Sequence, residues 1–403
     1  MKKHLVLAAG ILFGTLALPA QMQLLKDAKR AETPQQVIEI LTPAFTNPET
    51  AQLAETYVIP GKALFDEYDQ LLGWKSFGKL PEGGDLVMAN DLLGGYEFYM
   101  KALPLDSLPN EKGKIKTKYS REIINTISGH FADYNSAALT YWENKQYEGA
   151  YAAWEIFLSL AKNPTFARTI STVPADTLLG EICFNQALAA WQADKLENAL
   201  SSFEKAKTMG YNKKQMFDYA IAVASNMSNN DAVYAWAVEA QPLYGNEDSN
   251  YFGYIINHYL QNKDFDKAFS IINEAIANNP NNAQYYLVKG ILYDNQAKNA
   301  EAKAMFKKAL ELDSQNSQIL YNYGRSICQE AYALSDTAPT DPEEADKFYN
   351  EKLVPLFKEA ADYLEQAWNI DNENRDALNY LENVYYNLQD ETMLKDVQNR
   401  KLQ

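Results

Sequence analysis

Tyr285 to Asp313 read YYLVKGILYDNQAKNAEAKAMFKKALELD, and this stretch decides the fold. Each half of it carries small and aromatic residues three and four positions apart, and such residues share one face of a helix. Small residues on that face let two helices approach closely, while aromatic rings fill the space beside them. The residues are Tyr286, Gly290 and Tyr293 in the first half and Ala302, Phe306 and Ala309 in the second. The stretch therefore predicts two helices that pack against each other.

The alanine that opens the second helix of this pair can be followed along the chain. Ala199, Ala232, Ala268 and Ala302 are separated by 33, 36 and 34 residues. A period of about 34 residues is that of the tetratricopeptide helix–turn–helix unit. The segment resembles a tetratricopeptide repeat, in which a large residue, a small residue and Tyr are followed by Ala, an aromatic residue and Ala. The resemblance implies an all-α solenoid, a right-handed superhelix of antiparallel helix pairs in which each pair contacts only its neighbours.

The same pattern sets the predicted domain organisation. Residues 131–403 form the repeat array, with loop insertions at 163–177 and 331–352 and a capping repeat at the C-terminal end. The second insertion contains Pro, Asp and Ser, which favour turns, and it would split one repeat between its two helices. Residues 21–130 are less regular and are interpreted as degenerate repeats, with a separate small helical domain as the alternative.

The first twenty residues predict an export signal. Lys2 and Lys3 precede an uncharged apolar run from Leu5 to Leu18, and Ala20 offers a cleavage point. A run of about 14 residues is shorter than the ~20 residues of a transmembrane helix but suits a signal peptide. The segment holds no cysteine for a lipid anchor. We therefore expect an exported protein of Gram-negative bacterial type, either periplasmic or secreted, whose mature chain has no integral membrane segment.

Charge and cysteine content narrow the classes of function. A formal net charge of −16 opposes binding to nucleic acid and to anionic lipid surfaces. Cys183 and Cys328 lie several repeats apart, so they are expected not to form a disulfide bond. Three scattered histidines give no zinc-type spacing. Because we find no nucleophile elbow, phosphate-binding loop or HExxH motif, the sequence predicts no catalytic residue, no metal site and no cofactor.

The resemblance also implies where a partner would bind. In the tetratricopeptide family the first helix of each pair lines a concave groove, and the matching positions here are mostly amides and aromatics. Asn donates and accepts hydrogen bonds, and Tyr and Trp give contact area at low entropic cost. The candidates are Asn135, Leu139, Trp142, Phe184, Asn185, Leu188, Trp191, Asp218, Ile221, Tyr254, Asn257, Tyr321, Asn322, Arg325, Asn379, Tyr380 and Asn383. Arg325 is the only basic residue among them, so a groove that clamps a terminal carboxylate is not predicted.

These features favour a non-catalytic scaffold or adaptor of the bacterial cell envelope that binds a protein or peptide partner. A glycan-binding protein of a polysaccharide-uptake system is the alternative, because exposed Trp and Tyr can stack on sugar rings. An all-helical glycoside hydrolase is a second alternative, although no pair of carboxylates stands out for that chemistry. The choice of an adaptor depends on analogy with the fold, which by itself does not fix function.

Overall fold

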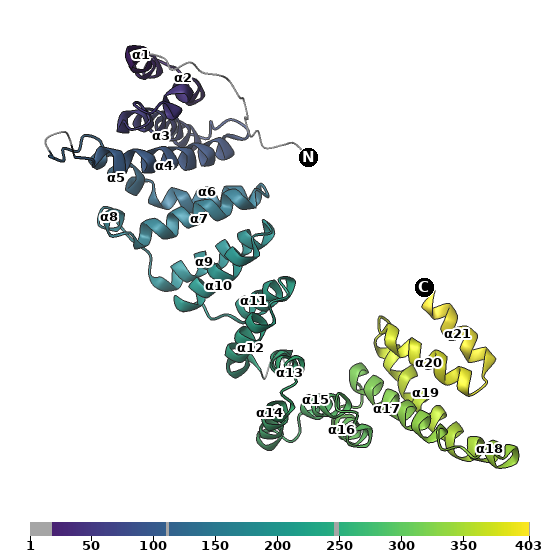
Figure 1. The fold of residues 1–403 in the computed structure, drawn as a ribbon. Coiled ribbons are helices and arrows are strands. Elements are labelled where there is room, and N and C mark those ends of the chain that lie inside the picture. The colour runs from purple at the N-terminus through teal and green to yellow at the C-terminus, as the bar shows by residue number, and fades with distance from the viewer. Residues whose placement is uncertain (1–17, 110–112, 246–249, 403) are drawn as a thin grey trace. The chain divides into compact units, whose positions relative to one another are not determined.

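The computed structural model describes residues 18–109, 113–245 and 250–402, and these residues form two compact units. The first unit ends at Ser228 and the second begins at Asn229. Each is built of helices that stack on their neighbours in antiparallel pairs (Figure 1). Among the described residues the only β feature is a single bridge between Pro109 and Ile115. The predicted all-α solenoid class is confirmed.

The first unit begins with a short helix pair, continues with two long helices and ends in shorter pairs. Its helices are α1 (Leu18–Ala28), α2 (Pro34–Thr46), α3 (Ala54–Ser76), α4 (Gly84–Asp106), α5 (Ser120–Gly129), α6 (Phe131–Glu143), α7 (Tyr147–Lys162), α8 (Pro164–Ala167), α9 (Asp176–Gln192), α10 (Leu196–Thr208) and α11 (Lys214–Asn226).

The second unit continues the alternation of helix and turn. Its helices are α12 (Asn230–Tyr244), α13 (Asn250–Gln261), α14 (Phe265–Asn278), α15 (Ala283–Asp294), α16 (Asn299–Leu312), α17 (Ser317–Ser335), α18 (Pro342–Phe348), the π-helical turn η1 (Tyr349–Leu353), α19 (Val354–Ile370), α20 (Arg375–Asn387) and α21 (Glu391–Lys401).

One turn geometry recurs between the two helices of a pair. A non-glycine residue with φ between 54° and 58° lies two or three residues after the end of the first helix, and we call it the turn residue. In the turn at Ala297, for example, the N–H of the next residue, Lys298, donates to the carbonyl of Tyr293 at 3.0 Å. This six-to-one bond satisfies a carbonyl at the end of α15 that would otherwise be unpaired. Within the two units the turn residues of the described chain are Lys145, Asp194, Lys263, Ala297 and Gln389, and Ser228, the last residue of the first unit, has the same φ.

The turn residues correct the predicted register at one position. A fully buried alanine stands five residues after three of the turn residues. These are Ala199 after Asp194, Ala268 after Lys263, and Ala302 after Ala297. Five residues after Ser228 stands Val233, which is buried, whereas the predicted Ala232 is only half-buried. The prediction of Ala232 as the core residue was therefore wrong by one position. A valine fills that place in the core, so counting alanines alone could not locate it.

Small residues set the distance between paired helices. A β-carbon added at Gly61 of α3 would stand 2.4 Å from the Tyr99 ring of α4, and one added at Gly95 of α4 would stand 2.9 Å from Phe65. In α17, a β-carbon on Gly324 would stand 2.9 Å from Leu364 of α19. Each glycine thus makes room for a large side chain of the partner helix. The irregular region before residue 130 pairs its long helices in the same way as the array does.

The two predicted insertions contain more helix than the sequence indicated. Residues 163–177 hold the short helix α8. In the stretch 331–352, α17 extends to Ser335, and α18 and η1 lead directly into α19, so that only residues 336–341 lie outside helices. Asp341 explains the restart, because its side chain accepts hydrogen bonds from the N–H groups of Glu343 and Glu344 at 3.1 Å and thereby caps α18.

Each unit encloses one cysteine. Cys183 of α9 and Cys328 of α17 are both fully buried and unbonded to another cysteine. Burial raises the pKa of Cys183 to about 11 and that of Cys328 to about 12. Because the thiolate is the reactive form, both sulfurs are held in an unreactive state in the folded protein.

Candidate functional site

The candidate groove residues occupy equivalent places in different repeats. Leu139 and Leu188 lie six residues before the turn residues Lys145 and Asp194, and Asn257 and Asn383 lie six residues before Lys263 and Gln389. Trp142 and Trp191 lie three residues before their turn residues. Equivalent positions in stacked repeats lie on the same face of successive first helices. Within each unit, the structure therefore arranges these side chains in rows.

Exposure separates the candidates into three groups. Phe184, Ile221 and Asn322 are 6%, 3% and 6% exposed, so these three are core residues and the prediction that they face a partner is corrected. The others retain surface for a partner. Exposed candidates are Leu139, Tyr254, Asn257, Asn379 and Asn383; half-buried ones are Asn135, Trp142, Asn185, Leu188, Trp191, Asp218, Tyr321, Arg325 and Tyr380.

The two tryptophans are held in place by other rings. Trp142 of α6 meets Tyr147 edge-on at 5.2 Å between ring centroids and lies 6.4 Å from Trp154, both on α7. Trp191 of α9 meets Tyr219 of α11 at 5.5 Å. Such contacts restrict the rotamers of both indoles before any partner arrives.

Several polar candidates already serve the repeat stack. The indole N–H of Trp154 donates to the Asn135 side chain at 2.9 Å and so joins α7 to α6. Arg325 of α17 forms an ion pair with Asp294 of α15 at 2.6 Å and lies over the ring of Tyr321. The single basic side chain of the candidate set therefore has its charge matched within the fold.

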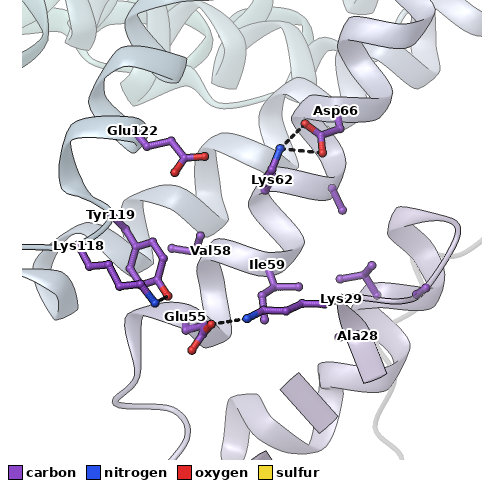
Figure 2. A pocket seen from close by; sticks show the side chains of 13 residues that line it. Ala28, Lys29, Glu55, Val58, Ile59, Lys62, Asp66, Lys118, Tyr119 and Glu122 are labelled. Atoms are coloured by element: carbon purple, nitrogen blue, oxygen red, sulfur yellow. Dashed lines mark hydrogen bonds and ion pairs between the residues drawn. The ribbon is translucent and has the colours of Figure 1, made fainter. Parts of the chain in front are cut away.

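A pocket lies at the start of the first unit, lined by residues of α1, α2, α3 and the start of α5 (Figure 2). We call this cavity of about 510 Å³ the α3 trough. Along α3 its wall is formed by residues spaced three and four apart, which is the period of one helix face. In order these are Glu55, Val58, Ile59, Lys62, Ala63 and Asp66. Ala28, Lys29, Ala31 and Val37 form one side wall, and Lys118, Tyr119 and Glu122 form the other.

Two ion pairs lie among the residues that line the trough (Figure 2). Lys29 pairs with Glu55 at 2.5 Å, and Lys62 pairs with Asp66 at 2.7 Å. Lys118 donates to the hydroxyl of Tyr119 at 2.6 Å, which raises the pKa of Lys118. Burial alone would raise the pKa of Glu55, but the hydrogen bond and charge of Lys29, together with the charge of Lys118, lower it. The rim is therefore charged while its floor is aliphatic.

One buried carboxylate fixes the Lys118 side of the trough. Asp106, at the end of α4, accepts hydrogen bonds from the backbone N–H groups of Lys118, Tyr119 and Ser120 and from the hydroxyl of Ser120 at 2.6 Å. Burial would raise the pKa of Asp106, but the hydrogen bonds from Ser120 and these N–H groups lower it. Residues 118–120, where α5 begins, are thus bound to the end of α4.

Sequence reasoning missed this site, although part of its signal was present. Residues 112–121 read KGKIKTKYSR, with lysine at every second position and an arginine at the end. This run is a local basic segment in a chain of net charge −16. The stripe on α3 was visible as a helical period as well. What the sequence did not show is that hydrogen bonds to Asp106 hold residues 118–120, of which Lys118 and Tyr119 line the trough.

In the part of the chain that the structure describes, no three His, Cys, Asp or Glu side chains gather where they could hold a metal ion. None of the helices in the described ranges combines the length and the apolar character needed to cross a bilayer.

Comparison with known proteins gives one family match. The family model described as tetratricopeptide repeat matches residues 283–316. Comparison with curated proteins returned no match.

Three solved structures that match this chain are described as TPR proteins, and each has low sequence identity to it. One is a TPR repeats protein from Bacteroides fragilis, with 16% identity over 64% of this chain and 98% of that chain and a TM-score of 0.32. A second is a tetratricopeptide repeat protein from Parabacteroides merdae, with 13% identity over 79% and 99% and a TM-score of 0.34. A third is YrrB, described as a TPR protein with an unusual peptide-binding site, with 18% identity over 49% and 89% and a TM-score of 0.30.

The family match coincides with the helix pair that decided the fold. Residues 283–316 span α15, its turn residue Ala297 and α16. The same turn geometry and the same buried position five residues later recur in other pairs of both units. This chain therefore contains a tetratricopeptide repeat at residues 283–316, within an all-α fold whose other helix pairs share its turn.

Proposed function

We propose that this protein is a non-catalytic adaptor of the bacterial cell envelope that binds a protein or peptide partner along the first helices of its repeats. The observation that carries the proposal is the recurrence of Leu139 with Trp142 at the same turn-relative positions as Leu188 with Trp191. An exposed or half-buried aliphatic side chain beside a restrained indole is a surface that a partner can bury at low entropic cost.

The second unit offers a more polar version of the same rows. Asn257 and Asn383 stand where the first unit has leucine, and Tyr254 and Tyr380 lie three residues before them. Amides and phenols that remain accessible can bond to a peptide backbone in either direction. A partner with an apolar segment and a polar segment fits this sequence of surfaces.

Photo-crosslinking in intact cells tests the adaptor proposal. A photoreactive amino acid is placed at Leu139 or Leu188 on the first helices, and at the exposed Ser201 of the second helix α10 as the matched control. We expect one protein to be captured from the first two positions and not from Ser201. The purified partner should then bind the full chain and lose at least tenfold in affinity to Leu139→Asp combined with Leu188→Asp.

The result that would overturn the proposal is an identical capture from all three positions, or a partner whose affinity does not respond to the double variant. Saturable binding of a defined oligosaccharide, abolished by Trp142→Ala or Trp191→Ala, would replace the adaptor by a glycan-binding protein.

Export is part of the proposal and has its own test. It is supported by Lys2 and Lys3 ahead of the apolar run Leu5 to Leu18, which is followed by the small residue Ala20. Alkaline phosphatase fused after residue 40 should be active, because that enzyme needs an oxidising compartment for its disulfides. An inactive but stable fusion would place the protein in the cytoplasm.

A further inference from the structure

We propose that one loop of the first unit binds the surface of an anionic phospholipid bilayer. This basic loop comprises residues 107–109 and 113–121, which lie between the end of α4 and the first residues of α5. It contains none of the first-helix residues on which the adaptor proposal depends. The inference therefore stands independently of that proposal.

The basic loop concentrates positive charge on an acidic protein. Residues 113–121 contain Lys114, Lys116, Lys118 and Arg121 and no Asp or Glu, whereas the whole chain has a net charge of −16. All four basic side chains are exposed. Within the described ranges, Lys116 and Arg121 form no ion pair and no side-chain hydrogen bond. The charges of these two side chains therefore remain available to an anionic group outside the protein.

The acids closest to the basic loop lie at its base. Asp106 accepts hydrogen bonds from the backbone N–H groups of residues 118–120. Glu55 is ion-paired with Lys29 at 2.5 Å. Glu122 follows the loop directly within α5, and consecutive helix residues do not face each other. The outer part of the loop thus keeps a positive surplus.

The same loop exposes two large aliphatic side chains. Leu108 is 54% exposed and Ile115 is 64% exposed. A β-bridge joins Pro109 to Ile115 and so brings Leu108, the residue before Pro109, close to Ile115. Aliphatic groups beside basic ones match the boundary between the charged head groups and the acyl chains of a bilayer. A soluble polyanion offers no apolar layer in which to bury them, so the combination favours a lipid surface.

The order of the residues suits such a boundary. Ile115 stands between Lys114 and Lys116 in the sequence. A lysine carries its ammonium group on a flexible aliphatic stem, so the charge stays at the level of the lipid phosphates while a neighbouring aliphatic side chain enters more deeply. The bonds to Asp106 and the bridge at Pro109 hold the loop in shape beforehand, which reduces the entropic cost of binding.

This local contact differs from the behaviour expected of the whole chain. A net charge of −16 opposes the approach of the protein to an anionic bilayer. At physiological ionic strength, however, exposed charges more than about 8 Å apart are largely screened from each other. A loop that touches the bilayer therefore interacts through its own charges. We expect weak, salt-sensitive attachment to the surface and not insertion across the membrane.

Sedimentation with lipid vesicles tests the inference. The full chain should bind vesicles of phosphatidylglycerol and phosphatidylethanolamine more tightly than vesicles of phosphatidylcholine, and the difference should shrink as salt rises. Lys116→Gln combined with Arg121→Gln should weaken binding to the anionic vesicles about five- to thirtyfold, because each basic residue near an anionic surface adds to the affinity. The matched control is Lys79→Gln with Lys352→Gln, which removes the same charge from exposed positions elsewhere. It should change binding by less than about twofold.

The apolar part of the loop has its own variant. Leu108→Ser combined with Ile115→Ser should weaken binding to the anionic vesicles about tenfold, since two aliphatic side chains no longer leave water. Every protein compared carries the same first twenty residues, so a contribution of their apolar run cancels in each comparison. Melting curves of the variants verify folding.

Three outcomes would overturn the inference. One is binding to phosphatidylglycerol vesicles that is absent or no tighter than binding to phosphatidylcholine. Another is equal weakening by the loop pair and the control pair, which would mean that only net charge matters. The third is a serine variant that binds as tightly as the wild type. The variant Leu139→Asp should leave vesicle binding unchanged, which separates failure here from failure of the adaptor proposal.

Discussion

Gly290 of α15 lies so close to the Phe306 ring of α16 that a β-carbon added at position 290 would stand 2.4 Å from that ring. Phe306 is fully buried and packs with Leu287 and Ala302 in the core of the second unit. The contact allows the aromatic ring of the second helix to lie against the backbone of the first. This contact explains why the stretch Tyr285 to Asp313 has its smallest residue at position 290 and an aromatic residue at position 306.

A side chain at Gly290 should therefore force these helices apart. We expect Gly290→Val to lower the free energy of unfolding by about 1–3 kcal/mol, because overpacking displaces a buried ring. Urea unfolding followed by circular dichroism measures the effect. Gly253 in α13 is the control, since a β-carbon there meets nothing within 4 Å. Gly253→Ala should raise stability by up to about 1 kcal/mol through helix propensity, and equal losses at both sites would contradict the packing described.

At a turn residue, which has a positive φ, we expect a change to glycine to raise the free energy of unfolding and not to lower it. Ala297 has φ of 56°, a conformation that costs a residue with a β-carbon about 1–2 kcal/mol. We expect Ala297→Gly to stabilise the second unit by roughly 0.5–1 kcal/mol, net of the extra freedom of glycine in the unfolded chain. The same substitution at the exposed Ala304, inside α16, should destabilise it by about 1 kcal/mol. Parallel chemical denaturation of the two variants gives the comparison, and effects of one sign would refute the argument.

Asp91 predicts a pH dependence of stability. Burial and, secondarily, the charge of Glu67 raise the pKa of this α4 carboxyl to about 7, and its Oδ2 atom is buried without a hydrogen-bond partner. A raised folded pKa means that the native state favours the protonated form. The destabilising cost is therefore absent below the unfolded pKa, near 4, and complete above about 7.

The variant Asp91→Asn removes the ionisation. Relative to the wild type, we expect its melting temperature to change little at pH 4 and to be higher at pH 8, where an unpaired buried charge costs at least about 1–3 kcal/mol. Thermal melts across this pH range measure the difference. A gap between the two proteins that stays constant with pH would show that Asp91 does not titrate in the folded state as described.

A buried amide joins neighbouring repeats of the first unit. Gln186 of α9 is fully buried; it donates to Glu155 of α7 and accepts from the hydroxyl of Ser202 of α10 at 3.0 Å. We expect Ser202→Ala to cost about 1–2 kcal/mol because it leaves the amide oxygen unpaired. The adjacent Ser201 is exposed, and Ser201→Ala should change stability by less than about 0.5 kcal/mol. Equal effects of the two alanines in a denaturant titration would argue against the buried bond.

The helix pairs could be predicted because their determinants are local. The spacing of Ala302, Phe306 and Ala309 by itself predicts a buried helix face, and all three residues are fully buried. The register failed at Ala232 because the core position there is held by Val233, and the pattern of small residues did not extend to it.

The sites were harder to foresee because they depend on contacts between distant segments. Phe184 matched a groove position in the sequence, yet it stacks on Tyr211 at 4.9 Å and is buried. The α3 trough exists because α1 and α2 cover α3 incompletely, and because Asp106 ties a segment 12 to 14 residues further along to the end of α4. How much of α3 is covered by its neighbours, and which distant residues bond to Asp106, cannot be read from a periodic pattern in the sequence.

Each buried cysteine can report when the helices of its own unit separate. Cys183 belongs to the first unit and Cys328 to the second, and a maleimide can reach either sulfur only when the surrounding helices separate. Mass spectrometry of peptides labelled over time would therefore give two opening rates from one unmodified sample. Those rates would tell whether the two halves open together or one before the other, without any engineered probe.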